Sequence, residues 1–353
     1  MTVTPATYSK KRILVAMSGG VDSTVCAKLL QKDGYDVHCA VFVFSDASES
    51  CVIASKSACE SMGVPLEIVD IKDSFRKDVV LPFCKTYCDG KTPNPCVICN
   101  PLVKFKTLCD TADKLGCPLI ATGHYANVET VGGVSILKKA LSAERDQSYM
   151  LYSLYQEQLS RLVLPLGNLT KPHVRKIAFE NQFASADAPD SQEICFIPDG
   201  DYPKFIHELG LRGKKGNFIS PDGTVICPHK GVEYYTVGQR RGLGIALGIP
   251  VFVGEISESG DVLLAASGEE YSSAIIVGNL LINPIYQNNL QRKFGVKIRS
   301  VSKPCSCSVE IVSESSAKIT FDTPQRAPAP GQAAVFYDCD YLAGGGIIQQ
   351  CIT

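Results

Sequence analysis

The sequence predicts an N-terminal α/β domain with a doubly wound parallel sheet, a short helical segment and a C-terminal β-barrel. Strand-like and helix-like runs alternate over about the first 145 residues, which is typical of a parallel sheet with helices on both faces. A glycine turn joins the first strand to the first helix. After residue 213, short apolar runs alternate with Gly, Pro, Asn and Asp, as in a small barrel or sandwich.

The individual elements follow from the hydrophobic pattern. Buried strands are expected at residues 13–16, 37–44, 64–69 and 118–123. Helices are expected from residue 21 to 30 and over residues 55–62, 102–115, 149–164 and 173–181. The short β-type runs are residues 216–219, 251–253, 262–264, 296–298, 317–321 and 333–337. We therefore expect three domains, at residues 1–145, 146–212 and 213–353.

Composition limits the location and the partners. The 353 residues carry 35 Lys and Arg against 36 Asp and Glu, so a nucleic-acid partner requires a local basic face. No run approaches 18 apolar residues, which predicts no membrane span. The opening sequence MTVTPATYSKKR has no apolar signal core, so we expect a cytoplasmic protein with reduced thiols. Most of the sixteen cysteines are expected to be small buried hydrophobes, including Cys26, Cys39, Cys109 and Cys117.

The turn after the first strand reads SGGVDS, residues 18–23. Its two glycines allow the backbone to approach a ligand closely, and its serines lie beside the exposed N–H groups of a helix start. The pattern therefore predicts a phosphate-binding loop. It is not a GxxxxGK[ST] loop, because no Lys follows the second Gly. The alternative is a flexible turn between strand and helix.

A second group of candidate functional residues consists of cysteines. Cys96 and Cys99 lie three residues apart behind two prolines, and Cys195 lies far along the chain. For the CxxC pair alone, half a zinc site, a redox pair and chance are all open. Zinc needs two further ligands, and the sequence has no second CxxC. The pairs Cys84/Cys88, on one helix face, and Cys305/Cys307, in a hairpin, are weaker candidates.

Seven strings occur in order: SGGVDS, TPNPCVICN, ATGHYA, RDQSYML, DSQEICF, YTVGQRRGLGI and PGQAAVFYD. Together they resemble the tRNA-specific 2-thiouridylase family of PP-loop ATP pyrophosphatases, over roughly residues 11–350. The resemblance implies replacement of O2 of the wobble uridine by sulfur in tRNAs for Glu, Gln and Lys. It implies a PP-loop domain, a helical adaptor and a β-barrel. ATP and Mg²⁺ are the implied cofactors, and the implied partners are tRNA and a sulfur donor, either a cysteine desulfurase or a relay protein.

The resemblance also implies roles for single residues. Cys99 matches the nucleophile and Cys195 the persulfide carrier, and under oxidation the two are expected to reach disulfide distance. Asp22 is expected near Mg²⁺ and Val43 near the adenine. The ATP contacts are Ala16, Met17, Ser18, Gly19, Gly20, Val21, Asp22, Ser23, Val43 and Gly123. The contacts to tRNA or its target base are Asn94, Pro95, Cys96, His124, Arg145, Asp146, Gln147, Arg299, Ser300 and Gln332. For His124 a purely structural role is the alternative.

The residue chemistry agrees with this activity. The uridine C2 carbonyl is a poor electrophile and its oxygen a poor leaving group. Adenylation of the oxygen supplies a leaving group, and a thiolate or persulfide is a good nucleophile at neutral pH. The reaction therefore needs an ATP-binding loop and a pair of thiols.

Two positions depart from the family pattern. The family usually has Asp where this chain has Cys96, and it usually has aromatic and basic residues after Arg299, where this chain continues with Ser300. A third thiol also permits another mechanism, since Cys96, Cys99 and Cys195 could hold a [4Fe-4S] cluster that binds hydrosulfide at an open iron. Two other functions are alternatives: a PP-loop amide-forming synthetase, which needs no cysteine pair, and a non-catalytic tRNA-binding or iron–sulfur protein.

Overall fold

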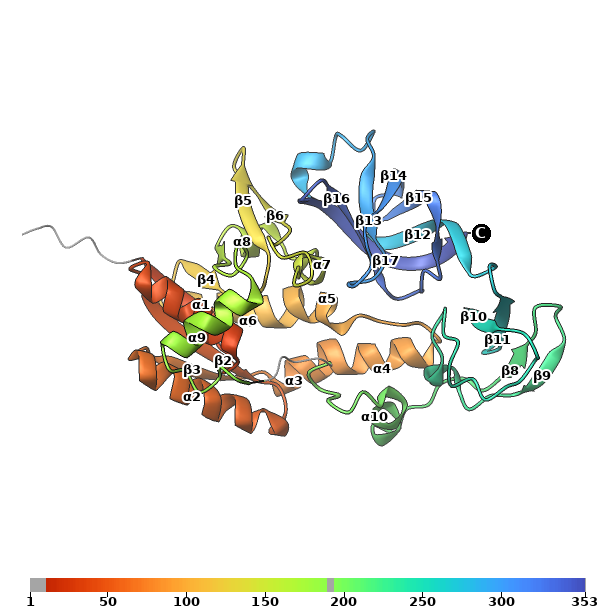
Figure 1. Cartoon of the computed structure of the whole chain (residues 1–353), viewed down its shortest axis with the longest axis horizontal. Helices are drawn as coiled ribbons and strands as arrows, with labels where there is room; N and C mark the ends of the chain where they lie inside the picture. Colours follow the sequence, from red (N-terminus) through yellow and green to blue (C-terminus); the bar gives the residue numbers. More distant parts are fainter. Residues whose placement is uncertain (1–10, 189–193, 353) are drawn as a thin grey trace, which may run out of the picture. The chain divides into compact units, whose positions relative to one another are not determined.

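The computed structural model describes residues 11–188 and 194–352, and the chain divides into two compact units (Figure 1). The α/β unit comprises Met1–Phe75 and Asn100–Asp190. The barrel unit comprises Arg76–Cys99 and Ser191–Thr353. The segment Arg76–Cys99 therefore groups with the C-terminal half of the chain. The division at residues 145 and 212 stays a prediction.

The α/β unit is built on a five-stranded sheet in the order β3-β2-β1-β4-β7. All four pairings between neighbours are parallel, as the apolar runs predicted. The strands are β1 Arg12–Ala16, β2 Asp36–Val43, β3 Leu66–Asp70, β4 Leu119–Ala121 and β7 Leu162–Val163. The order places β1 beside β4, where the strand sequence changes direction. In open sheets of this kind, ligands bind beyond the carboxyl ends of the strands at such a point.

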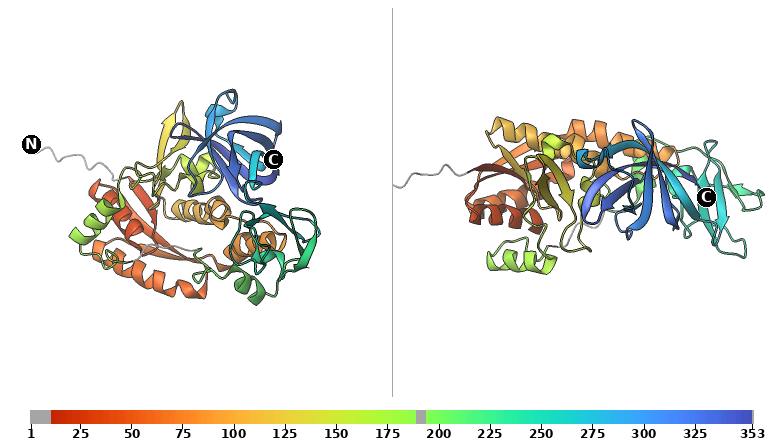
Figure 2. Two further views of the ribbon diagram at one scale, coloured as in Figure 1. Left: turned by 45° about the vertical axis from the view of Figure 1, so that its right-hand side comes forward. Right: turned by 90° about the horizontal axis from the view of Figure 1, so that it is seen from above.

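Helices cover both faces of this sheet (Figure 2). Ile13 and Val15 of β1 share one core cluster with the helices α1 Val21–Lys32, α2 Glu49–Met62 and α9 Lys171–Glu180. Helix α6, Phe105–Lys114, lies on the opposite face. A short helix, α3 Lys72–Phe75, follows β3. The predicted doubly wound fold is confirmed.

Two parts of the α/β unit differ from the sequence prediction. The helix expected over residues 149–164 is wrong: the segment forms α7 Ser148–Leu151, α8 Gln156–Leu159 and strand β7. The apolar side chains do not serve one helical face, since Leu162 instead joins the edge of the sheet beside β4. A hairpin of β5 Asn127–Val131 and β6 Val134–Lys138 was not predicted. The sequence feature that marks this hairpin is the pair Gly132 and Gly133, which both adopt positive φ at the tight turn.

The barrel unit contains a closed six-stranded antiparallel barrel in the order β12-β15-β14-β13-β16-β17, with β17 pairing again with β12. Closure leaves no unpaired sheet edge. The strands are β12 Tyr271–Ile282, β13 Phe294–Lys297, β14 Cys305–Ser313, β15 Ser316–Arg326, β16 Ala333–Asp338 and β17 Tyr341–Ile352. The predicted barrel is confirmed.

Within its described residues, the same unit also holds a second sheet and three α-helices. The sheet has the order β10-β11-β8-β9, with strands β8 Asn217–Ile219, β9 Val225–Pro228, β10 Val251–Ile256 and β11 Val262–Ala266. The helices are α4 Leu81–Cys88, α5 Pro95–Cys99 and α10 Tyr202–Glu208. Between residues 11 and 352, apart from the undescribed 189–193, no helix is both long and apolar enough to cross a bilayer.

Candidate active site

The SGGVDS turn joins β1 to α1 at the carboxyl end of the central strand. The Ser18 backbone N–H donates to Ser23 Oγ at 3.1 Å, and the Ser23 hydroxyl donates to the Gly20 carbonyl, also at 3.1 Å. The Thr24 hydroxyl donates to the same carbonyl at 2.9 Å. These bonds fix the shape of the loop without a ligand. Ser18 is exposed, whereas Val21 and Ser23 are buried.

Two glycines allow the surrounding backbone to approach this loop. Gly19 has φ +76°, and a Cβ there would lie 2.5 Å from Cβ of Ala54 in α2. A Cβ on Gly123, just beyond β4, would lie 2.8 Å from the carbonyl carbon of Asp22. Gly123 is therefore packed on the first turn of α1, and any larger residue at either position would displace the loop.

Asp22 lies in a partly buried ion pair that the sequence did not reveal. Lys171 Nζ contacts both Asp22 carboxylate oxygens at 2.8 Å, and the Tyr125 hydroxyl donates to Oδ1 at 2.8 Å. The Lys171 side chain is 8% exposed and that of Asp22 34%. The carboxylate thus keeps one open side. One local feature points to a paired lysine here. Lys171 lies in the first turn of α9, where a cation is unfavourable without a specific anionic partner.

The other predicted ATP contacts lie around the ends of β1 and β2. Ala16 ends β1, and the buried Met17 donates its N–H to the Ala40 carbonyl at 2.8 Å. Val43 ends β2, and its carbonyl accepts the Ile71 N–H at 2.9 Å. The strand ends thus bring these residues to the same edge of the sheet as SGGVDS.

His124 follows Gly123 in the loop beyond β4. Its Nδ1 lies 2.7 Å from the Thr122 hydroxyl, and its ring stacks on Phe105 with centroids 5.9 Å apart. Burial of the ring, together with the nearby charge of Lys104, lowers the pKa of His124 to about 3. The ring is therefore neutral at physiological pH and offers a neutral hydrogen-bonding group rather than a cation.

This depressed pKa predicts a pH-dependent stability. The unfolded chain takes up a proton near the ordinary histidine pKa of 6.5, whereas the folded ring stays neutral until about pH 3, so acid favours the unfolded state in that window. We expect the unfolding temperature of the wild type to fall more steeply between pH 6.5 and 4 than that of His124→Asn. His173, exposed on α9, supplies the control His173→Asn. Parallel pH profiles for wild type and His124→Asn would contradict this account.

Arg145, Asp146 and Gln147 follow the β5–β6 hairpin. The Asp146 carboxylate accepts the N–H groups of Ala140 and Ser148 at 3.1 and 3.2 Å. The Gln147 side chain accepts the Tyr125 N–H at 2.9 Å. Two of these three predicted tRNA contacts therefore also hold their own loop in place, while Arg145 is exposed.

The barrel unit contains all three predicted thiols. Cys96 and Cys99 lie three residues apart on α5, and Asn94 Oδ1 accepts the Cys96 N–H at 3.2 Å at the start of that helix. Pro95 is buried, Cys96 exposed and Cys99 half-buried. Cys195 is exposed. Of the DSQEICF string, residues 190–193 lie outside the described residues.

An aromatic cluster holds the segment that carries Cys195. The ring of Phe196, the next residue, packs on Phe83 of α4 and Phe205 of α10, with centroids 5.3 and 5.5 Å apart. Tyr202 of α10 stacks on Tyr87 of α4 at 5.7 Å. The aromatic cluster therefore anchors the segment beside the exposed Cys195 thiol.

Gln332 and its neighbours hold the segment that precedes α5. Gln332 Nε2 donates to the Thr92 carbonyl at 3.1 Å, and the Thr92 N–H donates to the Pro330 carbonyl at 2.8 Å. Between them, Gly331 has φ +95°, and a Cβ there would lie 3.0 Å from the Thr92 backbone. The Gln332 side chain thus positions the backbone two residues before Asn94.

Arg299 is also turned toward its own chain. Its Nη2 donates to the carbonyls of Ala327 and Val237 at 2.9 and 3.3 Å. Ser300 is half-buried beside it, and the next residue, Val301, is 94% exposed. The guanidinium therefore braces two loops within the barrel unit.

Of the other thirteen cysteines, six are buried, six are half-buried and one is exposed. Cys26, Cys39 and Cys117 are buried as expected, whereas Cys109 is only half-buried; partial burial still raises the pKa of its thiol. Burial likewise raises the pKa of Cys84 to about 11 and of Cys307 to about 12, which opposes thiolate formation at neutral pH.

The [4Fe-4S] cluster stays a prediction. Within residues 11–188 and 194–352, no three His, Cys, Asp or Glu side chains gather as ligands of one metal ion. Cys96, Cys99 and Cys195 therefore form no single-ion site in this structure. We derive no step of the reaction through a cluster.

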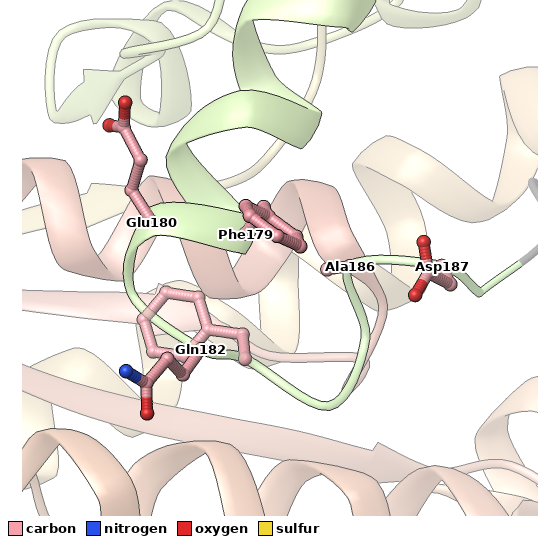
Figure 3. Close-up of a pocket in the computed structure, with 6 residues that line it drawn as sticks. Phe179, Glu180, Gln182, Ala186 and Asp187 are labelled. Atoms are coloured by element: carbon pink, nitrogen blue, oxygen red, sulfur yellow. The ribbon is translucent and has the colours of Figure 1, made fainter.

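The α/β unit also has a surface pocket that is lined by other residues (Figure 3). It is lined by the end of α9 and the loop that follows: Phe179, Glu180, Gln182, Phe183, Ala186 and Asp187. None of these is a predicted site residue, and Phe179 is 72% exposed.

Comparison with known families agrees with this architecture. The family models described as tRNA methyl transferase HUP domain, tRNA methyl transferase PRC-barrel domain and Aminomethyltransferase beta-barrel domain match residues 11–199, 204–266 and 274–348. The fold thus defines a class of proteins in which a HUP-type α/β domain with a phosphate loop precedes two β-rich domains.

Curated relatives identify the family within that class. The tRNA-specific 2-thiouridylase MnmA of Acetivibrio thermocellus is 40% identical over 97% of this chain and 100% of its own length. That of Halothermothrix orenii is 41% identical over 96% and 99%. The chain belongs to the tRNA-specific 2-thiouridylase family, as the sequence motifs predicted. A solved 4-thiouridine synthetase–RNA complex with bound ATP has a TM-score of 0.36 and 17% identity over 57% of this chain and 50% of that one, too distant to add to this argument.

Proposed function

We propose that the protein is an ATP-dependent tRNA sulfurtransferase that converts the wobble uridine to 2-thiouridine in tRNAs for Glu, Gln and Lys. The observation that carries the proposal is the family membership along the whole chain, together with a preformed phosphate loop and two accessible cysteines. A cytoplasmic location and a cysteine desulfurase or relay protein as sulfur donor belong to the same proposal.

In the first half-reaction, uridine O2 attacks the α-phosphorus of ATP and pyrophosphate leaves. The SGGVDS loop and the first N–H groups of α1 bind the departing pyrophosphate. The open side of the Asp22 carboxylate would hold the Mg²⁺ that accompanies ATP, and this ion would neutralise phosphate charge. Lys171 and Tyr125 hold the Asp22 carboxylate in one orientation, so we assign both as positioning residues.

In the second half-reaction, a persulfide on Cys195 attacks C2, and AMP leaves with the original oxygen. The Cys99 thiolate then attacks Cys195 Sγ, which releases 2-thiouridine and forms a Cys99–Cys195 disulfide. A thiol reductant restores both thiols in each cycle. Asn94, Pro95 and Cys96 precede the nucleophile and are proposed to enclose the target base, with Gln332 fixing the backbone before them.

The test is formation of 2-thiouridine by the purified chain with ATP, Mg²⁺, a persulfide donor, a thiol reductant and unmodified tRNA, measured by mass spectrometry of digested tRNA. We expect one 2-thiouridine and one AMP per tRNA. An amide-forming synthetase would form AMP without thiolated product, and its activity would survive Cys99→Ser. A non-catalytic tRNA-binding protein would release no AMP. Either result would overturn the proposal.

Cys96→Ala separates the two sulfur mechanisms. We expect this variant, prepared without iron, to thiolate tRNA with a persulfide donor, because the proposed persulfide route uses only the thiols of Cys99 and Cys195. Iron and sulfide analysis of anaerobically purified protein is the accompanying measurement. A wild type that binds iron and sulfide, together with an inactive Cys96→Ala that binds neither, would contradict the persulfide route.

A further inference from the structure

A loop between strands β9 and β10 of the barrel unit presents two arginines. We call residues 236–241 the arginine loop, since it ends with Arg240 and Arg241. It runs beside β10: the Gly238 N–H donates to the Val253 carbonyl at 2.7 Å, and the Val253 N–H donates to the Gln239 carbonyl at 2.9 Å. Backbone pairing of this kind fixes the loop before any partner binds.

Side chains add further restraints to the arginine loop. Gln239 Oε1 accepts the Thr236 N–H at 3.0 Å, and its Nε2 donates to the Arg241 carbonyl at 3.0 Å. Arg299 contacts the Val237 carbonyl from the barrel side. Gly238 has φ +87°, and a Cβ there would lie 2.6 Å from Cβ of Ala327. The two arginines therefore extend from a rigid base, which lowers the ordering cost of binding.

Two guanidinium groups approach one buried ring. The guanidinium carbons of Arg240 and Arg326 lie 5.9 and 4.8 Å from the ring centroid of Phe252, which is 4% exposed. The two cations are therefore no more than about 11 Å apart. Cation–π contact holds each planar group against the surface. Arg326 also donates its Nε–H to Glu270 at 3.1 Å.

The charges around this ring are not balanced. Arg326 pairs with Glu270 at 3.1 Å, and the Glu270 side chain is 5% exposed while that of Arg326 is 52% exposed. Arg240 and Arg241 are exposed, and neither forms an ion pair with any described residue. The whole chain carries a net charge of −1, so the arginines give this surface a positive charge that the chain as a whole does not have. Like charges held together in this way favour a polyanion.

We propose that Arg240, Arg241 and Arg326 form a binding surface for successive phosphates of the tRNA backbone. The inference rests on the proposed function, because tRNA is the polyanion that such an enzyme must bind. Guanidinium forks match phosphate oxygens in bidentate geometry, and phosphate contacts position an RNA without reading its sequence. The surface would supply the local basic face that a nearly neutral chain needs, while Arg299 and Gln332 contact their own backbone.

The test compares tRNA binding against salt concentration for the wild type, the double variant Arg240→Gln/Arg241→Gln, and Arg326→Gln. Removing one arginine–phosphate interaction should reduce the slope of log affinity against log salt by about 1. We expect a slope smaller by about 2 for the double variant, and a raised KM for tRNA in thiolation. The control is Arg292→Gln, since Arg292 also lies over a ring, 5.9 Å from Tyr286, and pairs with Asp338 at 2.6 Å. Its slope should equal that of the wild type.

Each outcome decides the matter. An unchanged slope in the double variant, or an equal reduction in Arg292→Gln, would refute the phosphate-binding surface. Normal tRNA binding with impaired sulfur transfer from a donor protein would assign the arginines to that protein instead, and would also refute it. A wild type that neither binds nor thiolates tRNA would refute the proposed function itself, whereas an active wild type with unaltered variants would refute only this surface.

Discussion

Lys171→Met is expected to reduce tRNA-dependent AMP formation about 100-fold or more, the usual cost of removing one group that organises charge at a reaction centre. Lys171 Nζ contacts both oxygens of Asp22, and without it the carboxylate keeps the Tyr125 hydroxyl but loses its cationic partner. Asp22→Asn should cause a comparable loss. The measurement is AMP release from radiolabelled ATP with saturating tRNA, alongside thermal unfolding of each variant.

The structure supplies a matched control on the same helix. Lys176 pairs with Glu180 at 3.8 Å on the exposed side of α9, and its side chain is 72% exposed. Lys176→Met removes the same charge and should leave AMP formation unchanged. Lys171→Arg keeps the charge and should retain part of the activity if position and charge both count. A folded Lys171→Met that forms AMP at the wild-type rate would refute the role of the ion pair.

Cys99→Ser and Cys195→Ser are each expected to abolish 2-thiouridine while adenylation of tRNA continues. The reason is that the proposed activation step uses the phosphate loop, whereas the proposed sulfur delivery uses thiols that belong to the other unit of the chain. Mass spectrometry of digested tRNA gives the product, and AMP release gives the first half-reaction. Cys339→Ser, at an exposed thiol on the barrel unit, is the control. Normal thiolation by either variant would contradict the assignment of the pair.

The phosphate loop was predictable because the residues that form it are consecutive in the sequence. Six consecutive residues, SGGVDS, lie between an apolar strand and an amphipathic helix, and the structure forms the loop from hydrogen bonds within those residues. Lys171 was missed because its partner Asp22 is 149 residues away, and only the tertiary fold brings them together. The one local feature was a lysine at the start of a helix, where a cation is unfavourable without an anionic partner.

The barrel, too, was only partly predictable from local sequence patterns. Short strands with turn residues between them predicted β structure, but the β12–β17 pairing that closes the barrel joins distant segments and has no local pattern. Residues 149–164 were misassigned because a short apolar run fits a helix and a buried strand equally well. Gln332 and Arg299 were assigned to tRNA by resemblance alone, and their contacts with Thr92 and Ala327 could only be seen once the chain was folded.

The most direct measurement follows the oxygen that leaves the uridine. Unmodified tRNA carrying ¹⁸O at the uridine O2 positions is incubated with the protein, ATP, Mg²⁺ and a persulfide donor, and the AMP is analysed by mass spectrometry. Because the adenylated oxygen departs with the phosphorus, each 2-thiouridine formed should release one AMP containing one ¹⁸O atom. Formation of 2-thiouridine with unlabelled AMP would contradict activation of the C2 oxygen by adenylation.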